Sequence, residues 1–216
     1  MKPKRLKKED FFFQPARLKE SDLILGSLEK LEYFSEDLTV VEIGTFWGLT
    51  ALTVVQVLNE LSCQSKFYSV DENQSYWSHI TRRVEDWTPK QKWNENLSKY
   101  LPGIKCIPSF VEQKSEDAVG LFNKIHWCLI DGCHCYECAS KDIELYGSKI
   151  VPGGFLLIDD TKQWDNKQSQ WYHDKKLPRR QAVIKAIKDS EVLQGFTLVG
   201  ESHVGHGLQL WRRNSA

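Results

Sequence analysis

The segment Ile130–Cys138, IDGCHCYEC, gathers one aspartate, one histidine and three cysteines within nine residues. Thiolates and imidazoles are ligands for zinc and for softer metal ions. The short separations between Cys133, Cys135 and Cys138, however, leave no second pair of ligands elsewhere to complete a tetrahedral structural site. The sequence therefore favours a loop in which Asp131 leads into a helix and the cysteines are incidental, with zinc binding as the alternative.

Further acidic residues follow or end other apolar runs. Glu42 lies two residues before a glycine in VEIGTFWG, Asp71 ends the apolar part of KFYSVDEN, and Asp159 and Asp160 close PGGFLLIDD. In an open α/β sheet, ligands bind outside the carboxyl ends of the strands. Each acid could singly be a helix cap or a solvated strand end. Their joint occurrence at strand ends indicates a binding site instead.

These residues need a scaffold of alternating strands and helices. Apolar periodicity predicts strands within residues 38–44, 66–73, 104–110, 125–132 and 152–160, and helices within 48–61, 75–87, 136–150 and 179–190, with an irregular or helical insertion at 88–100. This alternation indicates a parallel sheet that is covered on both faces. Residues 196–213 form two alternating runs around a glycine-containing turn, which predicts a closing antiparallel hairpin.

The 216 residues are enough for one domain with an appendage. Residues 1–36 are predicted to be a basic tail and an N-terminal helical appendage that packs on the sheet or over its ligand. Residues 37–216 are predicted to be the main domain. Spare apolar surface on the N-terminal helix would allow a homodimer.

The charge balance narrows the function classes. Lys and Arg number 29, as do Asp and Glu, so the chain lacks the positive field that nonspecific nucleic-acid binding needs. No apolar run approaches bilayer length, and the basic start is not followed by the apolar part of a signal peptide. The sequence predicts a soluble, cytoplasmic protein without nucleic-acid or membrane partners. The six cysteines then fit reduced thiols better than disulfides.

The first strand-to-helix turn has glycines four residues apart, at Gly44 and Gly48. This spacing differs from the G-x-G-x-x-G pattern that lets a helix terminus approach a pyrophosphate. Glycine still permits close approach of a ligand to the backbone, although the glycines alone are equally consistent with a tight turn. Asp71 is placed to accept both hydroxyls of a ribose. A nucleoside without phosphates fits both observations.

Four motifs, VVEIGTFWGLTA, YSVDEN, IDGCHCYE and VPGGFLLIDD, carry a family resemblance in their order and spacing. They resemble the class I S-adenosylmethionine-dependent methyltransferases, and more narrowly the metal-dependent small-molecule O-methyltransferases of the catechol and macrocin types. The resemblance covers residues from about 37 to 213. It implies a Rossmann-like methyltransferase fold, with a mostly parallel seven-stranded sheet, helices on both faces and a C-terminal antiparallel hairpin.

The resemblance implies that S-adenosylmethionine binds along the carboxyl edge of this sheet. Asp71 then holds the ribose, and Ser109, taken as the end of the third strand, lies beside the adenine. The methionine part is surrounded by Glu42, Gly44, Phe46 and Thr50. Gly48 and Asp131 complete the predicted cofactor-binding set.

The resemblance also implies a divalent cation, most simply magnesium, bound by Asp131, Asp159 and Asp160. Strands lie about 4.8 Å apart, so carboxylates at neighbouring strand ends can converge on one hard cation. Such a cation lowers the pKa of a substrate hydroxyl and positions its oxygen. His134 stands where the catechol-type family carries a catalytic lysine, which indicates a general base. A histidine that caps the helix or touches the cofactor is an equal alternative.

The resulting hypothesis is metal-assisted O-methylation of a small-molecule hydroxyl, with Asp131 and His134 as catalytic residues. A metal-independent methyltransferase and a non-catalytic cofactor-binding or interaction protein are the alternatives. A dehydrogenase fits the glycine spacing less well. The acceptor, whether sugar, phenol or peptide, is open. Aromatic residues on the polar segment after the fifth strand are candidates for a substrate lid, namely Trp164, Trp171, Tyr172 and His173.

Overall fold

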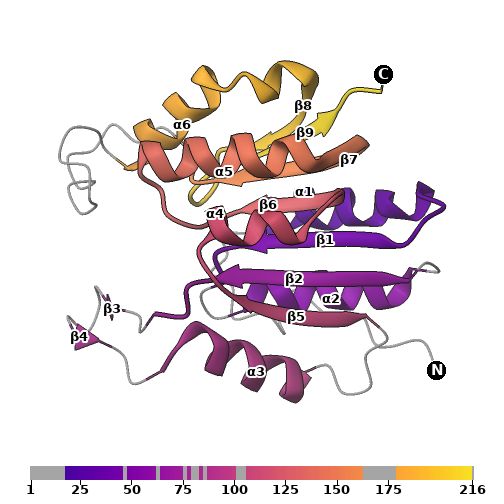
Figure 1. Cartoon of the computed structure of the whole chain (residues 1–216), viewed down its shortest axis with the longest axis vertical. Helices are drawn as coiled ribbons and strands as arrows, with labels where there is room; N and C mark the ends of the chain where they lie inside the picture. Colours follow the sequence, from indigo (N-terminus) through magenta and orange to yellow (C-terminus); the bar gives the residue numbers. More distant parts are fainter. Residues whose placement is uncertain are drawn as a thin grey trace.

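The computed structural model describes residues 18–45, 48–61, 64–74, 77–78, 83–84, 87–100, 106–162 and 179–215. Its main sheet is formed by β1 (Leu38–Ile43), β2 (Ser65–Asp71), β5 (Ile107–Glu112), β6 (Ile125–Ile130), β7 (Ile150–Asp159), β8 (Phe196–Ser202) and β9 (Leu208–Arg213). The strand order is β5-β2-β1-β6-β7-β9-β8 (Figure 1). The neighbouring pairs β5–β2, β2–β1, β1–β6 and β6–β7 are parallel, whereas β9 is antiparallel to both of its neighbours, β7 and β8. The predicted fold class is confirmed.

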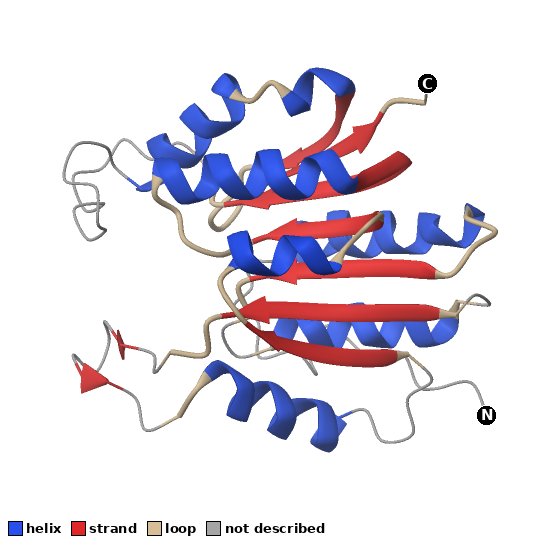
Figure 2. Cartoon of the chain, in the orientation of Figure 1, coloured by secondary structure: helices blue, strands red, loops and turns tan. Residues whose placement is uncertain are grey.

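Helices cover both faces of the sheet (Figure 2). They are α1 (Leu18–Glu29), α2 (Leu49–Glu60), α3 (Pro89–Tyr100), α4 (Ser115–Ala118), α5 (Tyr136–Lys149) and α6 (Arg179–Asp189), with 3-10 turns η3 (Lys30–Tyr33), η4 (Val119–Leu121) and η5 (Val192–Gly195). Successive strand residues point to opposite faces. Val40 accordingly joins the apolar cluster under α1, α2 and α3, and Val41 joins the cluster under α4, α5 and α6.

Helix α1 packs on the main sheet, which is one of the two placements expected for the appendage. Leu28 and Leu31 are fully buried in the same cluster as Val40. Trp127 of β6 donates its indole N–H to the Ser27 hydroxyl at 2.8 Å. The N-terminal helix is therefore part of the core, and the domain boundary near residue 36 stays a prediction.

The helix predicted over residues 75–87 is wrong where the structure describes this segment. Trp77–Ser78 (β3) and Arg83–Val84 (β4) pair antiparallel as a separate two-stranded ribbon. The sequence SYWSHIT is dominated by aromatic, β-branched and short polar residues, which favour extended backbone over helix. The insertion that follows is helical, as α3.

Several sequence predictions fall outside the described residues. These are Phe46, the first 17 residues, which include the basic tail, and the candidate lid residues Trp164, Trp171, Tyr172 and His173. Among the helices that the structure does describe, none has both the length and the apolar character that crossing a bilayer requires.

Candidate active site

The carboxyl ends of the parallel strands meet at one edge, on the left in Figure 1. Backbone hydrogen bonds tie the loops there together. Gly44 N–H donates to the Val70 carbonyl at 2.9 Å, and Asp131 N–H donates to the Ile43 carbonyl at 2.8 Å. The loops after β1 and β6 are thus fixed relative to each other before any ligand binds.

Glycine is required at Gly44. Its φ is +82°, and a Cβ there would lie 2.2 Å from the Asp131 carbonyl oxygen. No side chain fits at that distance, and L-residues rarely adopt that φ. Gly48 also has a positive φ, of +69°, and a Cβ would lie 3.1 Å from the Cα of Trp93. Both predicted glycines therefore close a tight strand-to-helix turn against neighbouring backbone.

Glu42 is a buried carboxyl at the end of β1. It accepts a hydrogen bond from the Ser69 hydroxyl at 2.9 Å, and that hydroxyl accepts one from the Trp93 indole at 2.9 Å. Burial, together with the smaller effect of the nearby negative charges of Asp131 and Asp71, raises the pKa of Glu42 to about 8. A carboxyl with this pKa is mainly protonated at neutral pH, and a cationic ligand beside it would favour ionisation.

Asp71 ends β2 as predicted and holds the neighbouring loops. Its Oδ2 accepts the Thr45 N–H at 3.0 Å, and its Oδ1 accepts the Asn73 N–H at 2.8 Å. Because each carboxylate oxygen offers two lone pairs, further donors such as ribose hydroxyls can still bind. Thr50, another predicted contact, lies in the first turn of α2.

The prediction that Ser109 ends the third strand is wrong. Strand β5 continues to Glu112, which pairs with Asp71, whereas Ser109 pairs with Tyr68 inside the sheet. Ser109 is thus three residues, or about 10 Å, from the edge. Residues around Glu112 reach the edge instead, and Glu112 accepts hydrogen bonds from the side chains of Asn73 and Lys90, each at 3.0 Å.

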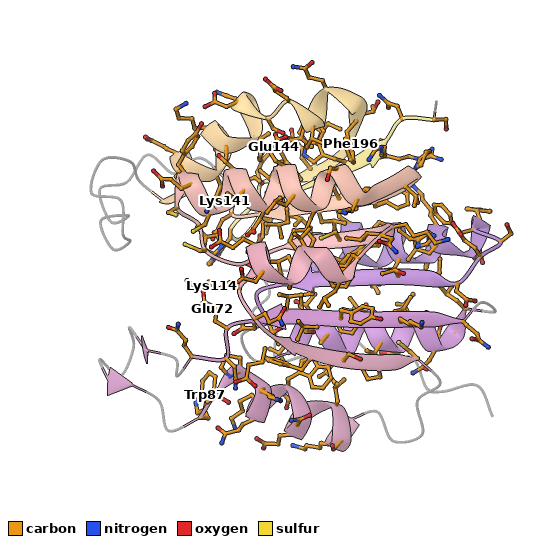
Figure 3. The ribbon with its side chains drawn as sticks, viewed as in Figure 1. Glu72, Trp87, Lys114, Lys141, Glu144 and Phe196 are labelled. Atoms are coloured by element: carbon orange, nitrogen blue, oxygen red, sulfur yellow. The ribbon has the colours of Figure 1, made fainter. Side chains whose placement is uncertain are left out.

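Figure 3 shows Glu72 and Lys114 at this end of β2 and β5. The continued run IPSFVE was the signal that the strand extends beyond Ser109. Lys114 and Ser115, which open α4, are therefore better placed than Ser109 to face a ligand at the edge.

Asp131, His134 and Asp160 come together at the ends of β6 and β7. His134 Nε2 lies 2.8 Å from Asp160 Oδ2 and 3.4 Å from Asp131 Oδ1. Each residue offers one ligand atom, and these three atoms lie within 4.8 Å of one another. Asp160 is only 1% exposed, so its negative charge has to be offset by ion pairs.

The hairpin turn between β8 and β9 adds His206, which the sequence analysis did not single out. His206 Nδ1 lies 3.1 Å from Asp160 Oδ1. The Lys162 N–H donates to the His206 carbonyl at 3.0 Å, and a Cβ on Gly207 would lie 2.3 Å from the Lys162 nitrogen. The turn is thus pressed against the segment after β7. The turn sequence HVGHG was the only available signal.

Asp159 does not belong to this group of three. It is buried at the end of β7, whereas Asp160 follows the strand with a left-handed φ of +58°. The group that the structure brings together within the described residues is two carboxylates and an imidazole, and the predicted set of Asp131, Asp159 and Asp160 stays a prediction. Two carboxylates and an imidazole suit Mn²⁺ or another transition metal ion better than Mg²⁺, which prefers oxygen ligands.

The three cysteines of the opening segment also meet. The Sγ atoms of Cys133, Cys135 and Cys138 lie within 4.8 Å of one another. All are free thiols, as are Cys106 and Cys128, and no disulfide is found among the described residues. Partial desolvation of the sulfur atoms raises the pKa of Cys133 and of Cys138, which disfavours the thiolate form of both.

A family model described as "Methyltransferase domain" matches residues 41–161. The match covers more than half of the chain and includes the glycine turn, Asp71, the Asp131 loop and the aspartates at the end of β7. The chain belongs to this methyltransferase family. Together with the strand order, this makes it a class I S-adenosylmethionine-dependent methyltransferase that resembles the small-molecule O-methyltransferases, as the motifs predicted.

Solved structures share the methyltransferase's fold. A protein assigned as a caffeoyl-CoA O-methyltransferase from Staphylococcus aureus aligns at a TM-score of 0.58 with 16% identity, covering 91% of this chain and 83% of that chain. An S-adenosylhomocysteine (SAH)-bound methyltransferase from Podospora anserina, PaMTH1, aligns at 0.57 with 16% identity, covering 98% and 83%. An rRNA methylase from Streptococcus thermophilus aligns at 0.57 with 14% identity, covering 94% and 99%.

At these identities the solved structures show the fold alone. No curated protein sequence gives a significant match to the chain. The methyl acceptor therefore has to be argued from the site.

Proposed function

We propose that this methyltransferase transfers the methyl group of S-adenosylmethionine to a hydroxyl of a small molecule, with a divalent cation assisting. The observation that carries the proposal is the cluster of Asp131, His134 and Asp160. It combines two carboxylates with a histidine, at the carboxyl edge of the sheet, where open α/β sheets bind their ligands. A proton acceptor and a cation site in one place are what O-methylation of a poorly acidic hydroxyl needs.

The other side of the same edge supplies the cofactor contacts in this proposal. Asp71 accepts the ribose hydroxyls while its bonds to Thr45 and Asn73 hold it in place. Glu42 ionises beside the cationic methionine part, because a positive charge nearby favours the carboxylate form. The glycine turn at Gly44 lets the cofactor approach the backbone beside these two side chains.

Asp131 and Asp160 hold the cation, which would polarise the acceptor hydroxyl and fix its oxygen. His134 takes up the hydroxyl proton, and the carboxylate of Asp160, 2.8 Å away, offsets the positive charge that results. His206 holds the second oxygen of Asp160 and so fixes its orientation. These residues thereby hold the imidazole that takes up the proton close to the substrate oxygen that receives the methyl group.

A different assignment makes His134 a metal ligand. The grouping of its Nε2 with two carboxylate oxygens within 4.8 Å favours this second role. The two roles differ in a measurable way. A His134→Gln variant that still binds Mn²⁺ as tightly as the parent but loses turnover identifies the base, whereas loss of Mn²⁺ affinity identifies the ligand.

A small-molecule acceptor is proposed in preference to RNA because of the charge balance. Equal numbers of basic and acidic residues provide no field to attract a phosphate backbone. The likeness to the rRNA methylase from Streptococcus thermophilus, at 14% identity, shows the fold alone. A metal-independent enzyme and a non-catalytic binding protein are the rivals that the first experiment has to separate.

We would first titrate the protein with SAH by calorimetry, in Mn²⁺, in Mg²⁺ and in EDTA. Binding in all three confirms the cofactor site, and an acceptor screen with and without EDTA then tests the metal. Turnover that survives EDTA and Asp160→Asn would remove the cation from the proposal. Binding without turnover on any hydroxyl acceptor would favour the non-catalytic protein.

A further inference from the structure

The cysteine cluster is chemically separate from the proposed catalytic group although the two alternate in sequence. His134 lies between Cys133 and Cys135, but its Nε2 contacts Asp160 and Asp131. The cysteine sulfurs instead form their own group, completed by Cys138 of α5. The loop therefore presents a hard, mainly oxygen donor set and a soft sulfur donor set.

The distances within the sulfur group fit a three-coordinate metal ion. Metal–thiolate bonds of about 2.3 Å place three sulfurs about 4.0 Å apart when the ion lies in their plane. The observed Sγ atoms lie within 4.8 Å of one another, so binding needs a contraction of less than about 1 Å. Rotation about the side-chain torsions of a partly exposed loop supplies such a movement.

Backbone groups already orient two of the sulfurs. The Cys138 N–H donates to Cys135 Sγ at 3.3 Å, and Cys133 Sγ accepts the backbone N–H of Cys135. Cys135 is the N-cap of the 14-residue helix α5, where the helix dipole favours negative charge. Lys141, labelled on α5 in Figure 3, is close enough to interact electrostatically with Cys138. These groups stabilise sulfur as thiolate once a metal replaces the proton.

We propose that Cys133, Cys135 and Cys138 form a site for a soft, thiophilic metal ion bound by three sulfurs, of which Cu(I) is the representative. Thiolate ligands select soft ions and reject Mg²⁺ or Mn²⁺. Zinc is the weaker candidate because its structural sites require four protein ligands, and this sulfur group contains three among the described residues. Cys133 is exposed, which gives the ion a path of entry.

This proposal is independent of the methyl acceptor and of the cation at Asp131 and Asp160. The spacing of the cysteines leaves no second ligand pair to complete a tetrahedral site. A three-coordinate ion does not need one.

The test is a titration of the full, reduced chain with Cu(I) under anaerobic conditions, in competition with a chromophoric Cu(I) chelator. One Cu(I) per chain is expected, with three sulfur neighbours at about 2.3 Å in the X-ray absorption spectrum. Cys133→Ser should lower the Cu(I) affinity more than about 100-fold, since even loss of an outer partner of a metal site costs about 10–100-fold. Circular dichroism and the urea midpoint should show that this exposed substitution leaves the fold intact.

Two matched variants define the control. Cys106→Ala removes a buried thiol far along the chain, and Asp160→Asn alters the oxygen-rich group. Both should bind Cu(I) as the parent does. Unchanged affinity in Cys133→Ser, loss of affinity in Asp160→Asn, or nitrogen and oxygen neighbours around the copper would each overturn the proposal. So would a reduced protein that does not compete with the chelator and only forms a disulfide in air.

Discussion

The two sides of the sheet edge are built in different ways. The glycine-turn side, Glu42, Gly44 and Asp71 at the ends of β1 and β2, is held by backbone hydrogen bonds and by a turn that admits no side chain. The histidine side is held by contacts between ionisable side chains at the ends of β6 and β7 and on the β8–β9 turn. Its members are Asp131, His134, Asp160 and His206.

A transferase has to bind its cofactor and to remove a proton from its acceptor, and the two sides of the edge are suited to these different tasks. A cofactor that is the same in every turnover can be bound by a rigid backbone surface. An acceptor that has to lose a proton needs groups that change charge. Substitutions on the histidine side should therefore affect turnover, and substitutions on the glycine-turn side should affect folding and cofactor binding.

The largest effect is expected for His134→Gln. Glutamine keeps a polar side chain of similar size but cannot take up a proton. We expect turnover with an identified acceptor to fall about 10²–10⁴-fold. SAH affinity, measured by calorimetry, should change less than about twofold. An equal loss of SAH affinity would mean that the two sides are not functionally separate.

Gly44→Ala should damage the other side through the backbone. The new Cβ would meet the Asp131 carbonyl at 2.2 Å, and alanine is strained at a φ of +82°. We expect a loss of about 3 kcal/mol or more in the free energy of unfolding, measured in urea. Gly120→Ala is the matched control, because a Cβ there meets nothing within 4 Å, and it should stay within about 0.5 kcal/mol of the parent.

Glu42→Gln should change how stability depends on pH. Burial raises the pKa of Glu42 from 4.5 to about 8, so the folded chain binds this proton more tightly than the unfolded chain. The carboxyl therefore favours folding at low pH, and this contribution is lost as the pH rises from about 4.5 to about 8. Above that range the glutamine variant should be more stable than the parent, by on the order of 2 kcal/mol.

Urea unfolding of both proteins at a series of pH values measures this difference. The glutamine variant should also bind S-adenosylmethionine more weakly, because it provides no negative charge for the cationic cofactor. Parallel pH curves for the two proteins would show that Glu42 is not buried as a protonated acid.

The smallest effect is expected for His206→Ala, which removes one contact from Asp160 without touching His134. We expect turnover to fall about tenfold and SAH affinity to stay unchanged. His203→Ala is the control from the same turn, since His203 is exposed and pairs with Glu201 instead. Equal losses in both variants would assign the effect to the turn rather than to Asp160.

The glycine-turn side was largely readable from the sequence because its residues act locally. The glycines at Gly44 and Gly48 follow directly on a β-branched run, and Asp71 closes the next run. The error at Ser109 arose from strand length, which periodicity defines poorly at its ends. The wrong helix at residues 75–87 arose where local propensity and apolar spacing disagreed.

The histidine side was readable only in part. Asp131 and His134 lie close together in the sequence, and the aspartates at the end of β7 were recognised as a pair. Which member of that pair faces Asp131 depends on backbone conformation at Asp160. His206 lies beside Asp160 because β9 pairs with β7. That pairing joins distant parts of the chain, and no local sequence pattern predicts it.

The position of β9 between β7 and β8 also sets an order of assembly. The β8–β9 hairpin can close early because its strands are adjacent in the sequence, whereas docking of β9 on β7 has to bring distant segments together. Glu42 of β1 pairs with Ser69 of β2, 27 residues away, whereas Asp159 pairs with Leu208, 49 residues away, so we expect the β1–β2 part of the glycine-turn side to form before that docking step. His206 can reach Asp160 only when the hairpin docks, so the contact that completes the histidine side is expected to be among the later ones to form.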